Sequence, residues 1–270
     1  MGVIRVKVRN YTDVVIRILT ALEKSDCLTV WHRSSSQSYP LYSVHYATKQ
    51  ADAGLIYISA GIHGDEPAGV ECAIRFIELL ADKQQSDLSS FPFDKYNWII
   101  SPCDNPYGYE HDIRENAAGL DLNRMFEHPC RYSETTFIAK SLLHTREHNN
   151  NTEVRIALDL HEDRDSEGFY LWERRASTTL PIGKEVVQHV AQLCAINQMS
   201  MIENHKNDNG VITLLDAVKT KGWTRGRYLA EKINTRCLIL ETPAKLDLDT
   251  RVKTHMLSIQ TAVKQAMKSH

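Results

Sequence analysis

Short apolar segments alternate with segments of helical periodicity along this 270-residue chain. LIYISA and VRIALDL are short and apolar, as buried strands are, whereas DVVIRILTALEK spaces its apolar residues as one face of a helix does. Strands separated by helices pair in parallel, because each helix carries the chain back to the end of the sheet where the previous strand began. We expect strands at residues 28–32, 41–47, 55–60, 96–101, 154–160, 169–172 and 236–241, and helices at 13–24, 67–81, 133–148, 181–196, 223–232 and 249–268.

This alternation predicts an α/β fold of three layers, in which a mostly parallel, mixed central sheet lies between helices on both faces. The chain contains no internal repeat, no low-complexity tract and no linker that would divide it. Proteins of this class commonly form one domain of about 250 residues. We therefore expect residues 1–270 to form a single domain.

Charge and hydropathy exclude several classes of partner. Lys and Arg number 32 against 34 Asp and Glu, so the basic excess of a nucleic-acid-binding protein is missing. No apolar run approaches the roughly 18 residues that a membrane span needs. The first residues lack the apolar core and cleavage site of a signal peptide, and the six cysteines are scattered without a C-x-x-C pair. We expect a cytoplasmic protein with reduced thiols that binds neither nucleic acid nor membrane.

Two of the twelve histidines follow predicted strands, at the edge of the sheet where open α/β proteins bind ligands. His63 lies three residues before Glu66 in HGDEPAG, and His161 ends the strand of VRIALDLH. Two imidazoles and one carboxylate from separate anchors are the ligand set of a catalytic zinc ion, which keeps one position open for water. Each histidine taken singly is also consistent with a solvated or capping residue, but the combination favours a metal site.

A long polar segment at residues 102–127 carries Arg114, Asn123 and Arg124. The planar guanidinium group gives two parallel hydrogen bonds to one carboxylate, so arginines beside an asparagine suit the binding of a carboxylate. Arginines in such a segment also serve as surface ion-pair partners. The nearby predicted metal site favours the ligand-binding interpretation.

Glu241 ends the last predicted strand, in ILETP. A carboxylate at the end of an apolar strand is costly to bury without a partner or a role. Beside a water molecule whose pKa is lowered to about 7 by zinc, Glu241 is placed to act as a general base. The alternative is an ion pair with a neighbouring Lys or Arg.

Together, and in this order, the motifs resemble those of the zinc carboxypeptidase superfamily. That superfamily contains the carboxypeptidase A-like enzymes and the branch of aspartoacylase and succinylglutamate desuccinylase. The resemblance extends from about residue 55 to residue 243. It implies a zinc-carboxypeptidase-like fold with one Zn²⁺ per chain, held by His63 and Glu66 of the H-x-x-E motif and by His161.

The segment RENAAGLDLNR resembles the arginine motif and the Asn-Arg pair of the same family. The resemblance implies that Arg114 polarises the scissile carbonyl and holds the oxyanion, while Asn123 and Arg124 bind the terminal carboxylate of the substrate. It also implies that Asp121 orients the first zinc histidine through a hydrogen bond. Glu241 matches the catalytic glutamate.

The resemblance implies a metallocarboxypeptidase that acts on a small peptide with a free carboxylate. The short sequence after Glu241 and the Glu-Thr-Pro motif resemble the peptidase branch, especially short bacterial murein-peptide carboxypeptidases. The compact spacing from His63 to His161 is closer to the deacylases, so an N-acyl amino-acid deacylase is the first alternative. A catalytically inactive, carboxylate-binding homologue is the alternative from another class.

Two details of substrate binding stay open in the sequence. Tyr170 and Tyr228 are both candidates for the family's substrate-binding tyrosine. In WTRGRY, Arg225 or Arg227 is a candidate for binding an acidic substrate side chain, because the corresponding segment lines the side-chain pocket in relatives. An ordinary solvated arginine at the start of a helix is the alternative.

A second zinc-like pattern, HTREH, places His144 and His148 one helical turn apart. It closes a predicted helix, where the helix dipole alone favours histidine. No acidic residue downstream has the context of a third ligand. We interpret this pattern as a helix terminus and not as a second metal site.

Overall fold

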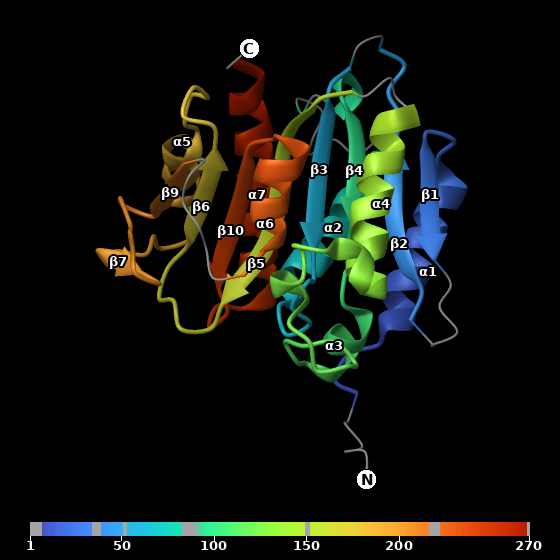
Figure 1. Cartoon of the computed structure of the whole chain (residues 1–270), viewed down its shortest axis with the longest axis horizontal. Coiled ribbons are helices and arrows are strands. Elements are labelled where there is room, and N and C mark those ends of the chain that lie inside the picture. Colours follow the sequence, from blue (N-terminus) through green and yellow to red (C-terminus); the bar gives the residue numbers. More distant parts are fainter. Residues whose placement is uncertain are drawn as a thin grey trace.

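The computed structural model describes residues 7–33, 39–50, 53–82, 91, 93–148, 152–215 and 222–268, with only the backbone for 32, 33 and 144–148. Within them, an eight-stranded sheet lies between two layers of helices (Figure 1). Its strands are β1 (Leu28–Arg33), β2 (Leu41–Tyr46), β3 (Leu55–Ala60), β4 (Asn97–Ser101), β5 (Val154–Asp163), β6 (Tyr170–Arg175), β9 (Val211–Leu215) and β10 (Cys237–Pro243). The helices are α1 (Tyr11–Lys24), α2 (Pro67–Ala81), α3 (Pro106–His111), α4 (Ser133–His148), α5 (Gly183–Val190), α6 (Arg225–Tyr228) and α7 (Leu248–Lys268).

The strand order is β1-β2-β4-β3-β5-β10-β6-β9. The centre of the sheet is parallel, since β3 pairs with β4 and β5, and β5 pairs with β10. Antiparallel pairs occur toward the sides, where β1 meets β2, β2 meets β4, and β6 meets β10. Every residue of β3 is buried, as expected of a central strand that is covered on both faces. The predicted three-layer α/β class with a mixed sheet is confirmed.

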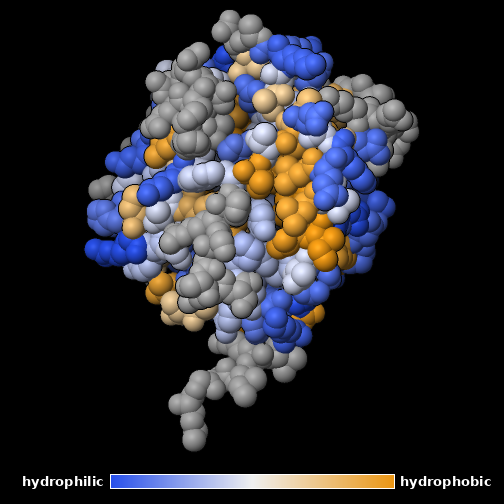
Figure 2. Space-filling model, turned by 90° about the vertical axis from the view of Figure 1, so that its right-hand side faces the viewer, coloured by the Kyte–Doolittle hydropathy of each residue, from blue (hydrophilic) through white to orange (hydrophobic). Residues whose placement is uncertain are grey.

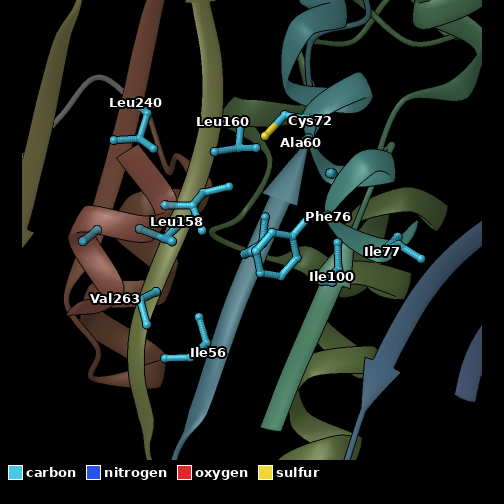
Figure 3. Packing of buried hydrophobic residues seen from close by; sticks show 14 of the residues in the cluster. Ile56, Ala60, Cys72, Phe76, Ile77, Ile100, Leu158, Leu160, Leu240 and Val263 are labelled. Carbon is cyan, nitrogen blue, oxygen red and sulfur yellow. The ribbon is translucent and has the colours of Figure 1, made fainter. Parts of the chain in front are cut away.

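Alternation of side chains along the strands separates the core into two layers. On one face, Ile56 and Leu158 pack with residues of α1, α2, α5 and α7, and Figure 3 shows Phe76 of α2 and Val263 of α7 against this face. On the other face, Tyr57 packs with residues of α4 and of the π-helical turn η5 (Leu229–Ile233). The second face carries fewer helices, and the cleft described below opens there.

Three local predictions were wrong or incomplete. The helix predicted at 181–196 is α5 alone, because Ile196 bridges to Phe169 and the backbone N–H of Asn197 donates to the Phe169 carbonyl. That tertiary pairing outweighs helical periodicity. Strand β9 and the small hairpin of β7 (Met201–Ile202) and β8 (His205–Lys206) were not predicted.

The long polar segment also contains regular structure that was not predicted. Helix α3 begins with Pro106 in its first turn and with the Asn105 side chain accepting from the Gly108 N–H. This is a common helix start, because proline lacks the N–H that the first turn leaves unbonded. The 3₁₀ turn η3 (Leu122–Arg124) follows, capped by Asp121.

The side of the molecule near β1 and α1 is shown in Figure 2, where an apolar area is surrounded by hydrophilic residues. Among the described residues, none of the helices combines the length and apolar character needed to cross a bilayer.

Candidate active site

The predicted site residues converge at the carboxyl ends of the central parallel strands. His63 and Glu66 lie in the turn between β3 and α2. His161 of β5 pairs directly with Glu241 of β10 in the strand register, so their side chains are neighbours on one face. The sequence predicted that His161 follows the strand. Strand β5 instead extends to Asp163, so His161 lies within it. Strand register therefore positions half of the site.

The side chains of His63, Glu66 and His161, which are all of types that bind metals, lie close together. The two carboxylate oxygens of Glu66 face the two histidines: Oε1 lies 2.6 Å from His63 Nδ1, and Oε2 lies 2.8 Å from His161 Nδ1. All three residues are buried, and their ligand atoms lie within 4.8 Å of one another. Two imidazole nitrogens and a carboxylate are the donor set of catalytic zinc. The residues present fit a zinc ion.

The opposite nitrogen of each imidazole faces a second carboxylate. His63 Nε2 lies 3.4 Å from Asp121 Oδ1, and His161 Nε2 lies 3.2 Å from Asp159 Oδ1. Such carboxylates fix the ring orientation, and here the Nδ1 atom of each ring faces Glu66. Sequence reasoning found Asp121 but missed Asp159. The available signal was its position two residues before His161, which places both side chains on the same face of the strand.

The electrostatics of the triad keep Glu66 ionised. Burial alone raises the pKa of Glu66, but the charges and hydrogen bonds of His63 and His161 outweigh it and hold the pKa well below its usual range. Burial lowers the pKa of His161, whereas Asp159 and Glu66 raise it to a net value well above that of free histidine. Metal binding at these nitrogens is therefore coupled to proton release.

A buried network of ion pairs lies next to the His63–Glu66–His161 triad and contacts it through Asp159. The Arg225 side chain is fully buried and pairs with Asp104 and with Asp159, whose Oδ2 accepts from Arg225 Nε at 3.1 Å. Burial raises the pKa of Asp104 to about 6, although Arg225 acts in the opposite direction. Arg225 thus holds a residue that orients His161. Its interpretation as a substrate-binding arginine was wrong, because both of its partners are buried carboxylates.

The arginine motif reaches the same cleft. Arg114, 39% exposed, donates through Nε and Nη2 to Asp121 Oδ2 at 3.1 and 3.0 Å. Asn123 accepts the Arg225 backbone N–H through Oδ1 at 2.8 Å, which orients its amide. Arg124 Nη1 donates to the Asn123 carbonyl. These side chains line a cleft of about 640 Å³ together with the three metal-ligand candidates and Glu241.

Glu241 stands beside the triad in the cleft wall. Burial raises its pKa to about 8, with further increases from the charges of Glu66 and Asp163, while His161 lowers it. A carboxylate in this environment has a strong affinity for a proton near neutral pH. Its place opposite His161 in the strand register sets this carboxyl group beside the three ligand-type side chains.

The structure separates the remaining candidates. Tyr170 lines the cleft, and its hydroxyl donates to Asp163 Oδ2 at 2.8 Å. Tyr228 packs on Phe126 and is not among the described residues that line the cleft. The guanidinium of Arg227 pairs with Glu231 and lies over the Trp223 ring, outside the residues that line the cleft. The prediction that Arg227 binds substrate is therefore not matched by its position, since Arg227 does not line the cleft.

The side chains of His144 and His148 lie outside the described residues. Their backbone forms the end of α4, as the sequence predicted for this pattern. Among the described residues, the His63, Glu66 and His161 group is the one set that could hold a metal ion.

The fold and the triad define a class: a three-layer α/β protein with a metallohydrolase-type centre at the carboxyl edge of its sheet. Residues 19–213 match the model of the zinc carboxypeptidase family. The chain belongs to the zinc carboxypeptidase family, as its motifs had indicated.

Individual relatives agree with this assignment. Carboxypeptidase SOL1 of Arabidopsis thaliana is 31% identical over 97 residues, which are 34% of this chain and only 20% of that protein. A candidate metallopeptidase of Shewanella denitrificans has the same fold, with a TM-score of 0.75 and 19% identity over 95% of this chain and 90% of that one. A metallo-carboxypeptidase of Burkholderia cenocepacia gives a TM-score of 0.68 and 18% identity, covering 93% and 68% of the two chains.

Asp121, which faces His63 Nε2, provides a first test of the predicted zinc site. We expect Asp121→Asn to weaken zinc binding by about 10- to 100-fold, because the amide no longer fixes the imidazole as a charged acceptor does. Competition with a chromophoric chelator measures this change. Asp165→Asn, an exposed acidic residue on the same cleft, is the matched control. Equal zinc affinities of the two variants would contradict the orienting role.

Proposed function

We propose that the chain is a zinc-dependent metallocarboxypeptidase that hydrolyses the C-terminal peptide or amide bond of a small substrate with a free carboxylate. The observation that carries the proposal is the convergence, in one cleft, of the His63–Glu66–His161 triad, Glu241 and the arginine motif. Because strands from both halves of the chain form a single sheet, we infer that residues 1–270 act as one catalytic domain.

His63, Glu66 and His161 would hold one zinc ion. Zinc, when bound, lowers the pKa of water to about 7 and polarises a carbonyl group. Glu241 would take the proton of the water as it attacks the carbonyl carbon and then deliver that proton to the leaving amine. The position of its carboxyl group supports this shuttle, because Glu241 lines the cleft opposite His161 in the strand register.

Arg114 would stabilise the negative charge that develops on the carbonyl oxygen. Its two bonds to Asp121 fix the guanidinium group beside the triad before substrate arrives, and fixed charges stabilise a transition state at little reorganisation cost. Asn123 and Arg124 would bind the terminal carboxylate of the substrate. The Oδ1 of Asn123 is bonded to the Arg225 N–H, so its NH₂ group is the donor that remains for a ligand.

A substrate panel tests the proposal against its alternatives. Zinc-loaded protein is assayed with blocked dipeptides and murein-type peptides, and in parallel with N-acetyl-aspartate and N-succinyl-glutamate. We expect release of C-terminal residues from the peptides, abolished by a chelator and restored by zinc. Cleavage of the N-acyl amino acids alone would identify a deacylase. Substrate binding at one zinc per chain without turnover on either series would identify an inactive homologue.

A further inference from the structure

The helix that begins beside Glu66 lacks a cap from its own first residues. Glu66 is the N-cap residue of α2, a position at which a polar side chain commonly accepts a backbone N–H of the first turn. The Glu66 carboxylate makes no such bond, and its two oxygens face His63 and His161 instead. The arrangement of the triad thus leaves the first N–H groups of α2 without their usual acceptor.

A carboxylate from a neighbouring strand takes this place. Glu162 of β5 is 5% exposed, and its Oε1 accepts the Ala68 N–H, in the first turn of α2, at 2.5 Å. Its Oε2 pairs with Arg251 of α7. A negative charge at this position is also favoured by the partial positive charge of the helix N-terminus. Both oxygens of Glu162 therefore bond within the protein, although the residue borders the cleft.

This bond connects the two segments that supply the triad. Ala68 lies two residues after Glu66, and Glu162 directly follows His161. A close backbone approach at Gly69 reinforces the connection, because a Cβ atom there would lie only 3.0 Å from the Leu160 Cβ and carbonyl oxygen. The first turn of α2 is therefore fixed to β5 on both sides of His161.

We propose that Glu162 is a positioning residue of the zinc site, which sets the placement of Glu66 relative to His161 by tying the first turn of α2 to β5. The inference rests on the proposed zinc-dependent function. Arg251 acts with Glu162, since it holds the second carboxylate oxygen and so fixes the orientation of the group. Zinc–ligand distances vary by only about 0.2 Å, so a small displacement of α2 along β5 is enough to weaken binding.

The chain offers a matched control in a second carboxylate of the same kind. Glu173 of β6 is fully buried, and its two oxygens accept the N–H groups of Ile182 and Gly183, at the start of α5, at 2.8 and 3.1 Å. Arg236 Nε lies 3.8 Å from one of these oxygens. Among the described residues, neither Glu173 nor any residue of α5 lines the cleft. Glu173→Gln therefore alters a cap of the same kind on a helix without metal-ligand candidates.

Zinc affinity, measured by competition with a chromophoric chelator, tests the proposal without turnover. We expect Glu162→Gln to weaken zinc binding by about 10-fold, as is typical when a residue that supports a metal ligand is changed. The amide keeps the size of the side chain but accepts hydrogen bonds through only one of its two ends. Glu173→Gln should lower the Tm to a similar extent and leave zinc affinity unchanged. Equal zinc affinities of the two variants would overturn the proposal.

Two further variants separate the charge of Glu162 from its reach. The double variant Glu162→Gln/Arg251→Met should bind zinc about as tightly as Glu162→Gln alone, because both residues act through one carboxylate. Fully additive losses of zinc affinity would contradict that shared action. Glu162→Asp keeps the charge but is one methylene group shorter, so it should weaken zinc binding as well. It is the test variant if Glu162→Gln does not fold.

Replacement of zinc by Co²⁺ gives a spectroscopic readout, since the visible absorption of Co²⁺ depends on the arrangement of its ligands. Glu162→Gln should change this spectrum, whereas Glu173→Gln should give that of the wild type. If zinc affinity and spectrum change as expected while wild-type protein cleaves no peptide, the positioning role stands and the proposed hydrolysis fails. If peptides are cleaved while Glu162→Gln and Glu173→Gln bind zinc equally, the hydrolysis stands and Glu162 is not a positioning residue.

Discussion

Glu241→Gln is expected to lower kcat/KM by about 10²- to 10⁴-fold while the protein keeps one zinc per chain. Gln has the shape of Glu but does not take a proton, so the variant removes the base and leaves the cleft in place. The triad that would hold the metal is made of other residues, and Glu241 faces it across the β5–β10 register. Steady-state kinetics on the best peptide, together with metal analysis of the same sample, measures both quantities.

Glu203→Gln is the matched control, because Glu203 also lines the cleft but is exposed to solvent. It should leave turnover within a few-fold of wild type. Undiminished turnover in Glu241→Gln would refute the assignment of the base. Loss of turnover together with loss of zinc would show that Glu241 acts through the metal site and not as a proton carrier.

Arg225→Leu is expected to lower the free energy of unfolding by about 3–5 kcal/mol, because it leaves two buried carboxylates without their cation. Asp104 and Asp159 are almost completely buried, and Arg225 is the cation with which both pair. In a protein of this size the loss corresponds to a fall in Tm of roughly 5–15 °C. Denaturant unfolding of the zinc-loaded protein gives the free energy, and calorimetry gives the Tm.

The neighbouring arginine makes this prediction specific. Arg227→Gln removes a charge two residues away, but one whose partner Glu231 lies in the following turn, η5, and is partly exposed. Its cost should stay below about 1 kcal/mol, as for surface ion pairs. Arg225→Leu should also weaken zinc binding, since Asp159 faces His161. Equal stability of the two variants would contradict the buried network as a structural support.

Much of the candidate site was predictable because its signals are local. His63 and Glu66 are three residues apart in one turn, and the clustering of Arg114, Asn123 and Arg124 is visible in a single segment. The central strands were predictable for the same reason, since a strand that is buried on both faces is a continuous apolar run. Strand β9 at the edge and the end of α5 were missed, because tertiary pairing decides them.

The roles of the three arginines near the cleft show the limit of this reasoning. In the sequence, Arg225 and Arg227 look equivalent, and Arg174 lies two residues beyond the strand predicted at 169–172. The structure buries Arg225 against two aspartates, turns Arg227 onto Trp223, and brings Arg174 into the cleft. Side-chain charge was evident from the residues, but the partner of each charge was not.

By itself, then, the sequence determined the layered α/β architecture, the family, and which side chains are chemically able to hold zinc and a carboxylate. Those properties depend on hydrophobic periodicity and on short motifs, which act over a few residues. The tertiary structure alone decided that Asp159 faces His161, that Arg225 pairs with two buried aspartates, and that Arg174 lines the cleft. Strand register and helix packing decide such pairings, because they bring together residues that are far apart along the chain.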